Sequence, residues 1–90
     1  MYRIFIAVGF EKSADNLSEK DQASVWKKIR GYAEPQLKSE PHFGLNIRKL
    51  RGYNPGTWRY RIGNFRLFYH LDEENKVVVF LYIEHRRDAY

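Results

Sequence analysis

Residues 58–69 read WRYRIGNFRLFY, and the expected architecture can be worked outward from them. Gly63-Asn64 at the centre is typical of a two-residue β-hairpin turn, because both residue types tolerate the positive φ that such turns need. Residues 57–62 and 65–71 on either side are rich in aromatic side chains, which favour strands. The segment therefore predicts an antiparallel hairpin.

A two-residue turn also predicts the pairing of the two strands. The expected pairs are Ile62–Phe65, Arg61–Arg66, Tyr60–Leu67, Arg59–Phe68 and Trp58–Tyr69. Since side chains alternate along a strand, the hairpin has an apolar face and a basic one. The apolar face, which we expect in the core, carries Trp58, Tyr60, Ile62, Phe65, Leu67 and Tyr69. The other face carries Arg59, Arg61, Arg66, Phe68 and His70.

The first half of the chain predicts a strand followed by two helices. Residues 2–8 are typical of a strand, which we expect to end at Gly9. A short amphipathic helix follows, with apolar residues at Phe10, Ala14 and Leu17. Residues 18–21 match a capping box and predict the start of a second helix. Its apolar stripe is Ala23, Trp26, Ile29 and Ala33, and we expect Pro35 to end it.

The remaining segments complete an α+β fold. Residues 35–47 predict an irregular connection, 47–50 either a strand or a helix end, and 52–56 a turn. A polar turn at 72–75 leads to a last strand at 77–84. We expect one domain, residues 1–90: an N-terminal strand, a helical hairpin and a three-strand antiparallel meander, with the helices packed on the sheet.

Charge points to a polyanionic partner for the second half. The chain has a formal net charge of +5. Residues 1–44 carry 7 Lys and Arg against 6 Asp and Glu, whereas residues 45–90 carry 9 against 5, and seven of the nine arginines lie in residues 48–87. The guanidinium group matches phosphate geometry, so an acidic or nucleic-acid partner is expected.

The basic face of the hairpin is costly unless an anion binds it. Like charges opposite each other on paired strands repel, and the hairpin itself contains no acidic residue to offset Arg59, Arg61 and Arg66. A solvated charged face is the alternative to an anion site. Phe68 on this face would either stack on a base or pack beneath a loop.

Other chemistries receive little support. No cysteine is present, which excludes disulfides and thiolate metal sites, and the three histidines lack zinc-ligand spacing. The apolar N-terminal stretch is too short to span a membrane and lacks the features of a signal peptide, so a cytoplasmic location is expected.

Three segments together resemble the RelE/ParE toxin superfamily. They are residues 49–52 (KLRG), residues 58–69 and residues 85–90 (HRRDAY). That superfamily typically carries a lysine-leucine-x-glycine stretch, a Y-R-I-R-x-G-x-Y-R-x-x-Y hairpin and a G-H-R-R-x-x-Y ending. The resemblance implies a toxin that cuts mRNA in the ribosomal A site by attack of the 2′-OH, giving a 2′,3′-cyclic phosphate. It implies no metal or cofactor, and neutralisation by a cognate acidic antitoxin.

The resemblance also implies roles for particular residues. Arg61 and Arg66 would hold the scissile phosphate, Arg86 would lie near the departing 5′-oxygen, and Tyr90 would stack on or orient the nucleotide. The expected RNA-binding residues are Arg59, Phe68, Arg87, Lys49 and Arg51. Some relatives have lysine in place of Arg59 and Arg61, and arginine is a poor general base. The base is therefore unassigned, with His70 and His85 as candidates.

Three alternatives stay open. The first is a toxin of the same superfamily that poisons DNA gyrase, a branch that usually lacks the basic residues and terminal tyrosine found here. The second is an RNA-binding module without catalysis, although no RNP-type aromatic motif is present. The third is an inactive relative.

Overall fold

The computed structural model describes residues 1–53 and 56–86. The elements follow one another as β1 (Arg3–Ile6), α1 (Val8–Asp15), α2 (Glu19–Lys28), the π-helical turn η1 (Ile29–Ala33), α3 (Glu34–Ser39), β2 (Ile47–Lys49), β3 (Trp58–Ile62), β4 (Phe65–Asp72) and β5 (Val77–His85). Within these residues, no helix is long and apolar enough to cross a membrane.

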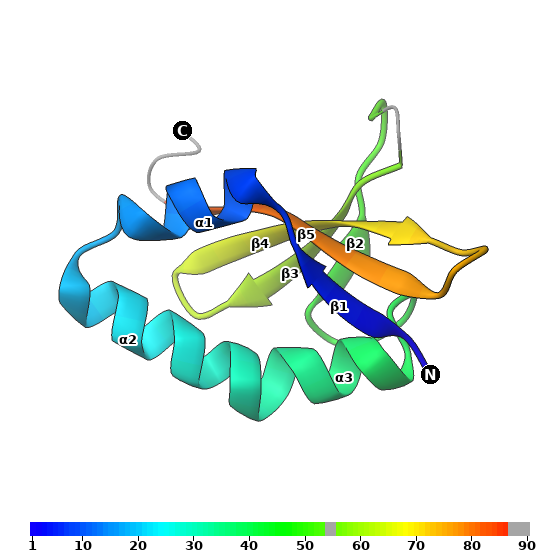
Figure 1. The fold of residues 1–90 in the computed structure, drawn as a ribbon, viewed down its shortest axis with the longest axis horizontal. Helices are drawn as coiled ribbons and strands as arrows, with labels where there is room; N and C mark the ends of the chain where they lie inside the picture. The colour runs from blue at the N-terminus through cyan, green and yellow to red at the C-terminus, as the bar shows by residue number, and fades with distance from the viewer. Residues whose placement is uncertain (54–55, 87–90) are drawn as a thin grey trace.

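The five strands form one mixed sheet in the order β1-β5-β4-β3-β2 (Figure 1). The meander of β3, β4 and β5 is antiparallel, as expected, while β1 pairs in parallel with β5. Residues 47–49, which the sequence left open between strand and helix end, form an additional edge strand antiparallel to β3. The α+β fold class is thus confirmed, with one strand more than the meander and the N-terminal strand.

The hairpin has the predicted register. All five expected pairs between β3 and β4 occur, from Ile62–Phe65 at the turn to Trp58–Tyr69. Gly63 has a φ of +54°, which suits the tight turn. Five of the six expected core residues are buried and Trp58 is half-buried. The predicted division of the hairpin into a core face and a basic face is therefore confirmed.

The helical segment does not end at Pro35. The helix continues through η1 and α3 to Ser39, and α2, η1 and α3 form one long rod along the molecule (Figure 1). Pro35 lies in the first turn of α3, directly after η1, where the Glu34 amide still donates to the Ile29 carbonyl. The wider π-helical turn precedes the proline, and the rod continues past it. The buried stripe is also displaced from the expected one, since Ala23 is exposed. Its fully buried members are Val25, Ile29, Ala33 and Leu37.

Gly9 lies inside α1 and does not mark the end of a strand. A β-carbon there would come within 2.9 Å of the Leu81 carbonyl oxygen, so only glycine lets α1 approach β5 this closely. The pairing of β4 with β5 shifts at this point, because Phe68 faces Tyr82 and Tyr69 faces Phe80. Leu81 is the extra residue of a β-bulge. Beside it, the Ile83 amide donates to the Ser13 hydroxyl (2.9 Å), which ties the bulged strand to α1.

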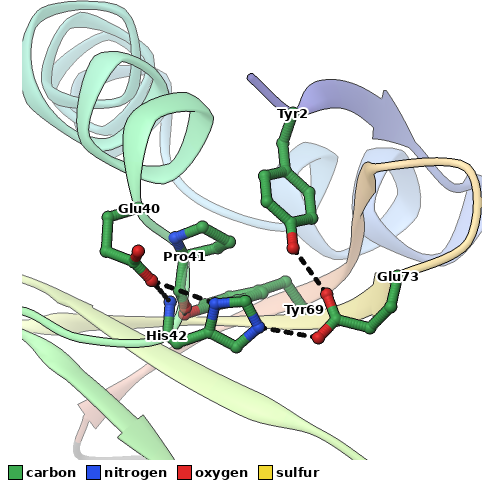
Figure 2. A network of polar contacts seen from close by, with 6 residues as sticks. All are labelled: Tyr2, Glu40, Pro41, His42, Tyr69 and Glu73. Atoms are coloured by element: carbon green, nitrogen blue, oxygen red, sulfur yellow. Dashed lines mark hydrogen bonds and ion pairs between the residues drawn. The ribbon is translucent and has the colours of Figure 1, made fainter.

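A polar network joins three segments that are far apart in the sequence (Figure 2). The His42 ring lies between two carboxylates, with Nδ1 3.0 Å from Glu40 Oε1 and Nε2 2.7 Å from Glu73 Oε2. The Tyr2 hydroxyl donates to Glu73 Oε1 (2.6 Å), and this bond raises the pKa of Tyr2 to about 12. The Tyr69 hydroxyl donates to the Pro41 carbonyl (2.7 Å) beneath the same loop. The network connects the N-terminus, the loop after α3 and the β4–β5 turn.

Candidate nucleic-acid interface

The sheet brings five arginines together, which we call the arginine face: Arg48 of β2, Arg59 and Arg61 of β3, Arg66 of β4, and Arg86 just after β5. Arg48 is the register partner of Arg59, and Arg61 that of Arg66. The Arg86 amide donates to the Asn64 carbonyl (2.6 Å), which holds the end of β5 against the hairpin turn. Pairing between strands therefore assembles cations from four segments.

Two adjoining hollows open on the arginine face. A small one of about 60 Å³ is lined by Arg59, Arg61, Gly63, Phe65, Arg66 and Arg86. A larger one of about 480 Å³ is lined by Arg48, Leu50, Tyr53, Arg59, Arg66, Phe68, Tyr82 and Glu84. Arg59 and Arg66 line both. A phosphate in the first hollow and a sugar or base in the second could thus bind to one continuous surface.

Arg59 is the electrostatic centre of this surface. Its pKa is lowered, first by burial and then by the positive charges of Arg66, Arg48, Arg61 and Arg86. Its Nε is buried and has no hydrogen-bond partner among residues 1–53 and 56–86. A buried donor without a partner is costly, and like charges around it add to the cost. An anion bound here would accept a hydrogen bond from Nε and offset the repulsion.

Two of the predicted RNA-binding side chains are not available on this face in the expected way. Phe68 is only 5% exposed, because Tyr82 stacks on it with ring centroids 4.5 Å apart. Of the two alternatives for Phe68, the exposed ring does not occur; the ring is covered, by Tyr82 of β5 and not by a loop, and Phe68 still lines the larger hollow. Lys49 pairs with Trp58, and its ammonium lies 5.6 Å from the centroid of that ring. Trp58 belongs to the core side, so Lys49 lies on the side of the sheet opposite the arginines.

The structure describes some of the remaining predicted site residues and not others. Arg51 is exposed in the turn after β2. Arg87 and Tyr90, predicted from the C-terminal motif, lie outside the described residues. The small hollow is lined by Arg59, Arg61 and Arg66, which the sequence placed on one face of the hairpin. Arg86, which was predicted from the C-terminal motif, lines it as well.

Neither histidine candidate for acid–base chemistry is among the described residues that line the small hollow. His70 Nδ1 lies 2.9 Å from the Gly56 carbonyl oxygen, and four residues of extended strand, about 13 Å, separate His70 from Arg66. His85 is the register partner of Phe65 and packs edge-on against its ring, with centroids 4.9 Å apart. Since Phe65 belongs to the core, His85 lies on the helix side of the sheet.

Sequence reasoning missed several residues that line the two hollows, among them Arg48, Tyr82 and Glu84. Arg48 would have been found if residues 47–49 had been taken as a strand beside β3. Tyr82 and Glu84 depend on the register of β5, which the bulge shifts. Glu84 is the register partner of Arg66, and it is the only carboxylate among the described residues that line the two hollows.

Comparison with known proteins gives one family. A sequence model of the family described as "ParE toxin of type II toxin-antitoxin system, parDE" matches residues 4–90. Toxin RelG of Mycobacterium tuberculosis is 40% identical over 60 residues. That match spans 66% of this chain and 66% of the length of RelG, just under two thirds of each.

Solved structures show the same fold. The chain is similar to a chain of the toxin–antitoxin complex RelBE2 from Mycobacterium tuberculosis, with a TM-score of 0.73, 25% identity, and coverage of 94% of this chain and 98% of that one. It is also similar to the isolated RelE toxin of E. coli, with a TM-score of 0.66, 21% identity, and coverage of 94% and 84%. The second likeness speaks for the fold alone.

Proposed function

Because the chain belongs to the ParE toxin family of type II toxin–antitoxin systems, within the RelE/ParE superfamily, we propose that it is a toxin that cuts mRNA on the ribosome. The observation that carries the proposal is the arginine face, where the buried Arg59 Nε has no partner in the part of the chain that the structure describes and four further arginines surround it. A phosphodiester is the ligand that relieves both costs. A toxin that acts on translating ribosomes would be located in the cytoplasm.

The proposed reaction is transfer of the phosphoryl group to the neighbouring ribose oxygen. The 2′-oxygen bonds to phosphorus as its proton leaves, the bond from phosphorus to the 5′-oxygen breaks, and the 5′-oxygen takes up a proton. The products are a 2′,3′-cyclic phosphate and a free 5′-hydroxyl. Arg61 and Arg66 hold the phosphate and offset the negative charge that grows on its oxygens, while Arg86 stands by the departing oxygen. Tyr90 orients the nucleotide, as the resemblance implies.

Glu84 is our candidate for the group that accepts the 2′-OH proton. It lies on the arginine face opposite Arg66, whereas His85 is on the helix side and His70 is held by Gly56. A carboxylate can act as a general base when it lies within hydrogen-bond reach of the hydroxyl. The superfamily ending has glycine where this chain has Glu84, so the assignment concerns this chain in particular.

We propose a cognate acidic antitoxin as the protein partner. Relatives of this fold are described as toxin–antitoxin complexes, including RelBE2 of Mycobacterium tuberculosis. A chain of opposite charge that folds onto the arginine face would cover the residues proposed to bind RNA.

The test is mapping of mRNA ends by primer extension after brief expression of the full chain, with Arg66→Ala as the variant. We expect in-frame cuts that require translation and that fall by about 10²–10³-fold in Arg66→Ala, the effect of removing one charge-stabilising donor. Arg3→Ala, which removes an exposed arginine from the opposite edge of the sheet, is the matched control and should cut as the wild type does. Circular dichroism of both variants checks that they fold.

A second function, poisoning of DNA gyrase, is favoured by the ParE description of the matching family. The same experiment separates the two. Growth arrest with induction of the DNA-damage response, and without mRNA cuts, would replace cleavage by gyrase poisoning. If neither mRNA cuts nor the DNA-damage response were observed, the remaining alternatives would be a binding module without catalysis and an inactive relative.

A further inference from the structure

A third hollow, of about 170 Å³, lies at the outer edge of β3, where the hairpin turn meets the helical rod. Lys28 and Tyr32 line it from the rod, Asn46 from the segment before β2, and Arg61 and Gly63 from the hairpin. A dry cavity of about 150 Å³ accommodates a benzene ring, so this hollow has room for a six-membered aromatic ring.

The third hollow adjoins the small hollow of the arginine face. Arg61 and Gly63 line both of them. The Arg61 amide donates to the Asn46 carbonyl (3.0 Å), so the backbone beside Arg61 and the wall formed by Asn46 are held together. A strand whose phosphate lies against the arginines would therefore carry its neighbouring nucleotide to this edge.

The side chains around the third hollow suit a nucleobase. The Tyr32 side chain is 71% exposed and belongs to η1, and π-helical turns occur frequently at functional sites. An exposed ring offers a stacking surface for any base. The Asn46 side-chain amide supplies both a donor and an acceptor for a base edge.

Lys28 adds a positive charge directly beside the hairpin turn. Its Nζ lies 3.1 Å from the place that a β-carbon on Gly63 would occupy. The ammonium thus reaches from the rod across to the hairpin, at the boundary between the two hollows. Lys28 thus extends the row of positive side chains from the arginine face around the edge of the sheet, where a nucleic-acid backbone could follow it.

We propose that the third hollow is the binding site for the base of a nucleotide adjoining the scissile phosphate. The base stacks on Tyr32, Asn46 hydrogen-bonds to its edge, and Lys28 contacts the adjoining phosphate. The site would make cleavage depend on the identity of that base. This inference rests on the proposed function, since it extends the same RNA path.

The test is sequencing of RNA ends across many mRNAs in cells that briefly express the full chain, comparing wild type, Tyr32→Ala, Tyr32→Phe and Asn46→Ala. Because stacking on an aromatic ring contributes substantially to binding of each base, Tyr32→Ala should reduce cutting about tenfold or more, and Tyr32→Phe should retain it. Asn46→Ala should change the relative use of sites that differ at one adjoining base. Phe43→Ala, which removes a similarly exposed ring outside the hollow, should leave the cutting pattern unchanged.

Binding of a labelled single-stranded tetranucleotide to the full chain separates this inference from the proposed function. Wild-type chain that cuts no mRNA but binds the tetranucleotide through Tyr32 would overturn the nuclease and keep the base site. Wild-type chain that cuts, with rate and site preference unchanged in Tyr32→Ala and Asn46→Ala, would overturn the base site alone. Loss of antitoxin binding in Tyr32→Ala, with cutting unchanged, would reassign the hollow to a protein contact.

Discussion

Arg59 illustrates how a single side chain can favour binding at the expense of folding. Its guanidinium is partly buried among four other arginines, and no described residue accepts a hydrogen bond from its Nε. Both features disfavour the free protein, because the charge has lost part of its hydration and the donor has lost its water. An anion bound to Arg59 would offset the positive charge and accept a hydrogen bond from Nε. Binding would therefore recover free energy that was lost on folding.

Replacing Arg59 by methionine should therefore stabilise the free protein. We expect a gain of about 1 kcal/mol in the free energy of unfolding, since a partly buried charge with an unpaired donor is removed while the aliphatic stem is kept. Urea unfolding in phosphate-free buffer measures it. Phosphate should stabilise the wild type more than Arg59→Met. Arg30→Met, at an exposed arginine in η1, should change stability by less than about 0.5 kcal/mol. A loss of stability in Arg59→Met would show that Arg59 has a structural role.

The helical elements owe their positions to a few close contacts with the sheet. Gly9 of α1 lies against the Leu81 carbonyl at the bulge of β5, whereas a β-carbon on Gly31 of η1 would meet no atom within 4 Å. Both glycines are in helical backbone, where alanine is normally the more stable residue. The two positions differ in their contact with β5, which Gly9 makes and Gly31 does not.

Alanine at these two glycines should have opposite effects. Gly31→Ala should stabilise the protein by up to about 1 kcal/mol, the usual gain in a helix. Gly9→Ala should destabilise it by about 1–3 kcal/mol, because the methyl group forces α1 away from the bulge. Equilibrium urea unfolding of both variants provides the comparison. Equal effects would mean that α1 moves without cost and that the bulge does not require glycine.

The network around His42 should make stability depend on pH. The hydrogen bond to Glu73, with a further contribution from Glu40, raises the pKa of His42 above its usual value. The pKa of Glu73 is lowered, first by its hydrogen bond from Tyr2 and then by the one to His42. A histidine with a raised folded-state pKa contributes stability that is fully present below its unfolded pKa of about 6.5 and is lost as pH rises through the folded pKa. The carboxylates of Glu40 and Glu73, whose pKa values are lowered, show the opposite dependence on pH. The stability that they contribute is lost as pH falls below about 4.5.

His42→Gln should reveal this dependence. The difference in unfolding free energy between wild type and His42→Gln should be largest between about pH 5 and pH 6.5 and should shrink above that range, as the histidine loses its second proton. Thermal or urea unfolding at half-unit pH steps measures the difference. A difference that stays constant from pH 5 to pH 9 would contradict a charged His42 between Glu40 and Glu73.

Across the molecule, positive charge is concentrated where strands from the second half of the chain meet. The excess over residues 45–90 becomes a compact group only in the folded sheet, where β2, β3, β4 and the end of β5 lie side by side. A basic surface of this kind binds polyanions with a strong dependence on salt, because each phosphate contact releases counterions.

The salt dependence of RNA binding should report the number of arginines in contact. For single-stranded RNA, Arg61→Ala should reduce the slope of log binding constant against log salt by roughly 0.7, the contribution of one phosphate contact. Fluorescence anisotropy with a labelled oligonucleotide at several KCl concentrations measures the slope. Arg3→Ala at the far edge of the sheet should leave it unchanged. A slope that is equal in all three proteins would place the RNA elsewhere.

The hairpin, its register and its two faces could all be predicted from the amino-acid sequence. These depend on contacts between residues close in the chain: a two-residue turn at Gly63-Asn64 and a period of two on either side. The C-terminal part of the motif and the family were also accessible from sequence, because they are carried by residue identities in order. The extent of the helical rod was not, since Pro35 is compatible with the first turn of a helix as well as with its end.

Which residues surround the hairpin depends on how the whole chain folds. Arg48 joins Arg59, Tyr82 covers Phe68 and Glu84 faces Arg66 because β2 and β5 pair with the hairpin in particular registers, one of them shifted by a bulge. The third hollow likewise depends on Lys28 and Tyr32 of the rod meeting the hairpin turn. Local periodicity assigns a side chain to one face of its own strand or helix. Its neighbours across the fold depend on long-range packing, which the spacing of residues along the chain does not record.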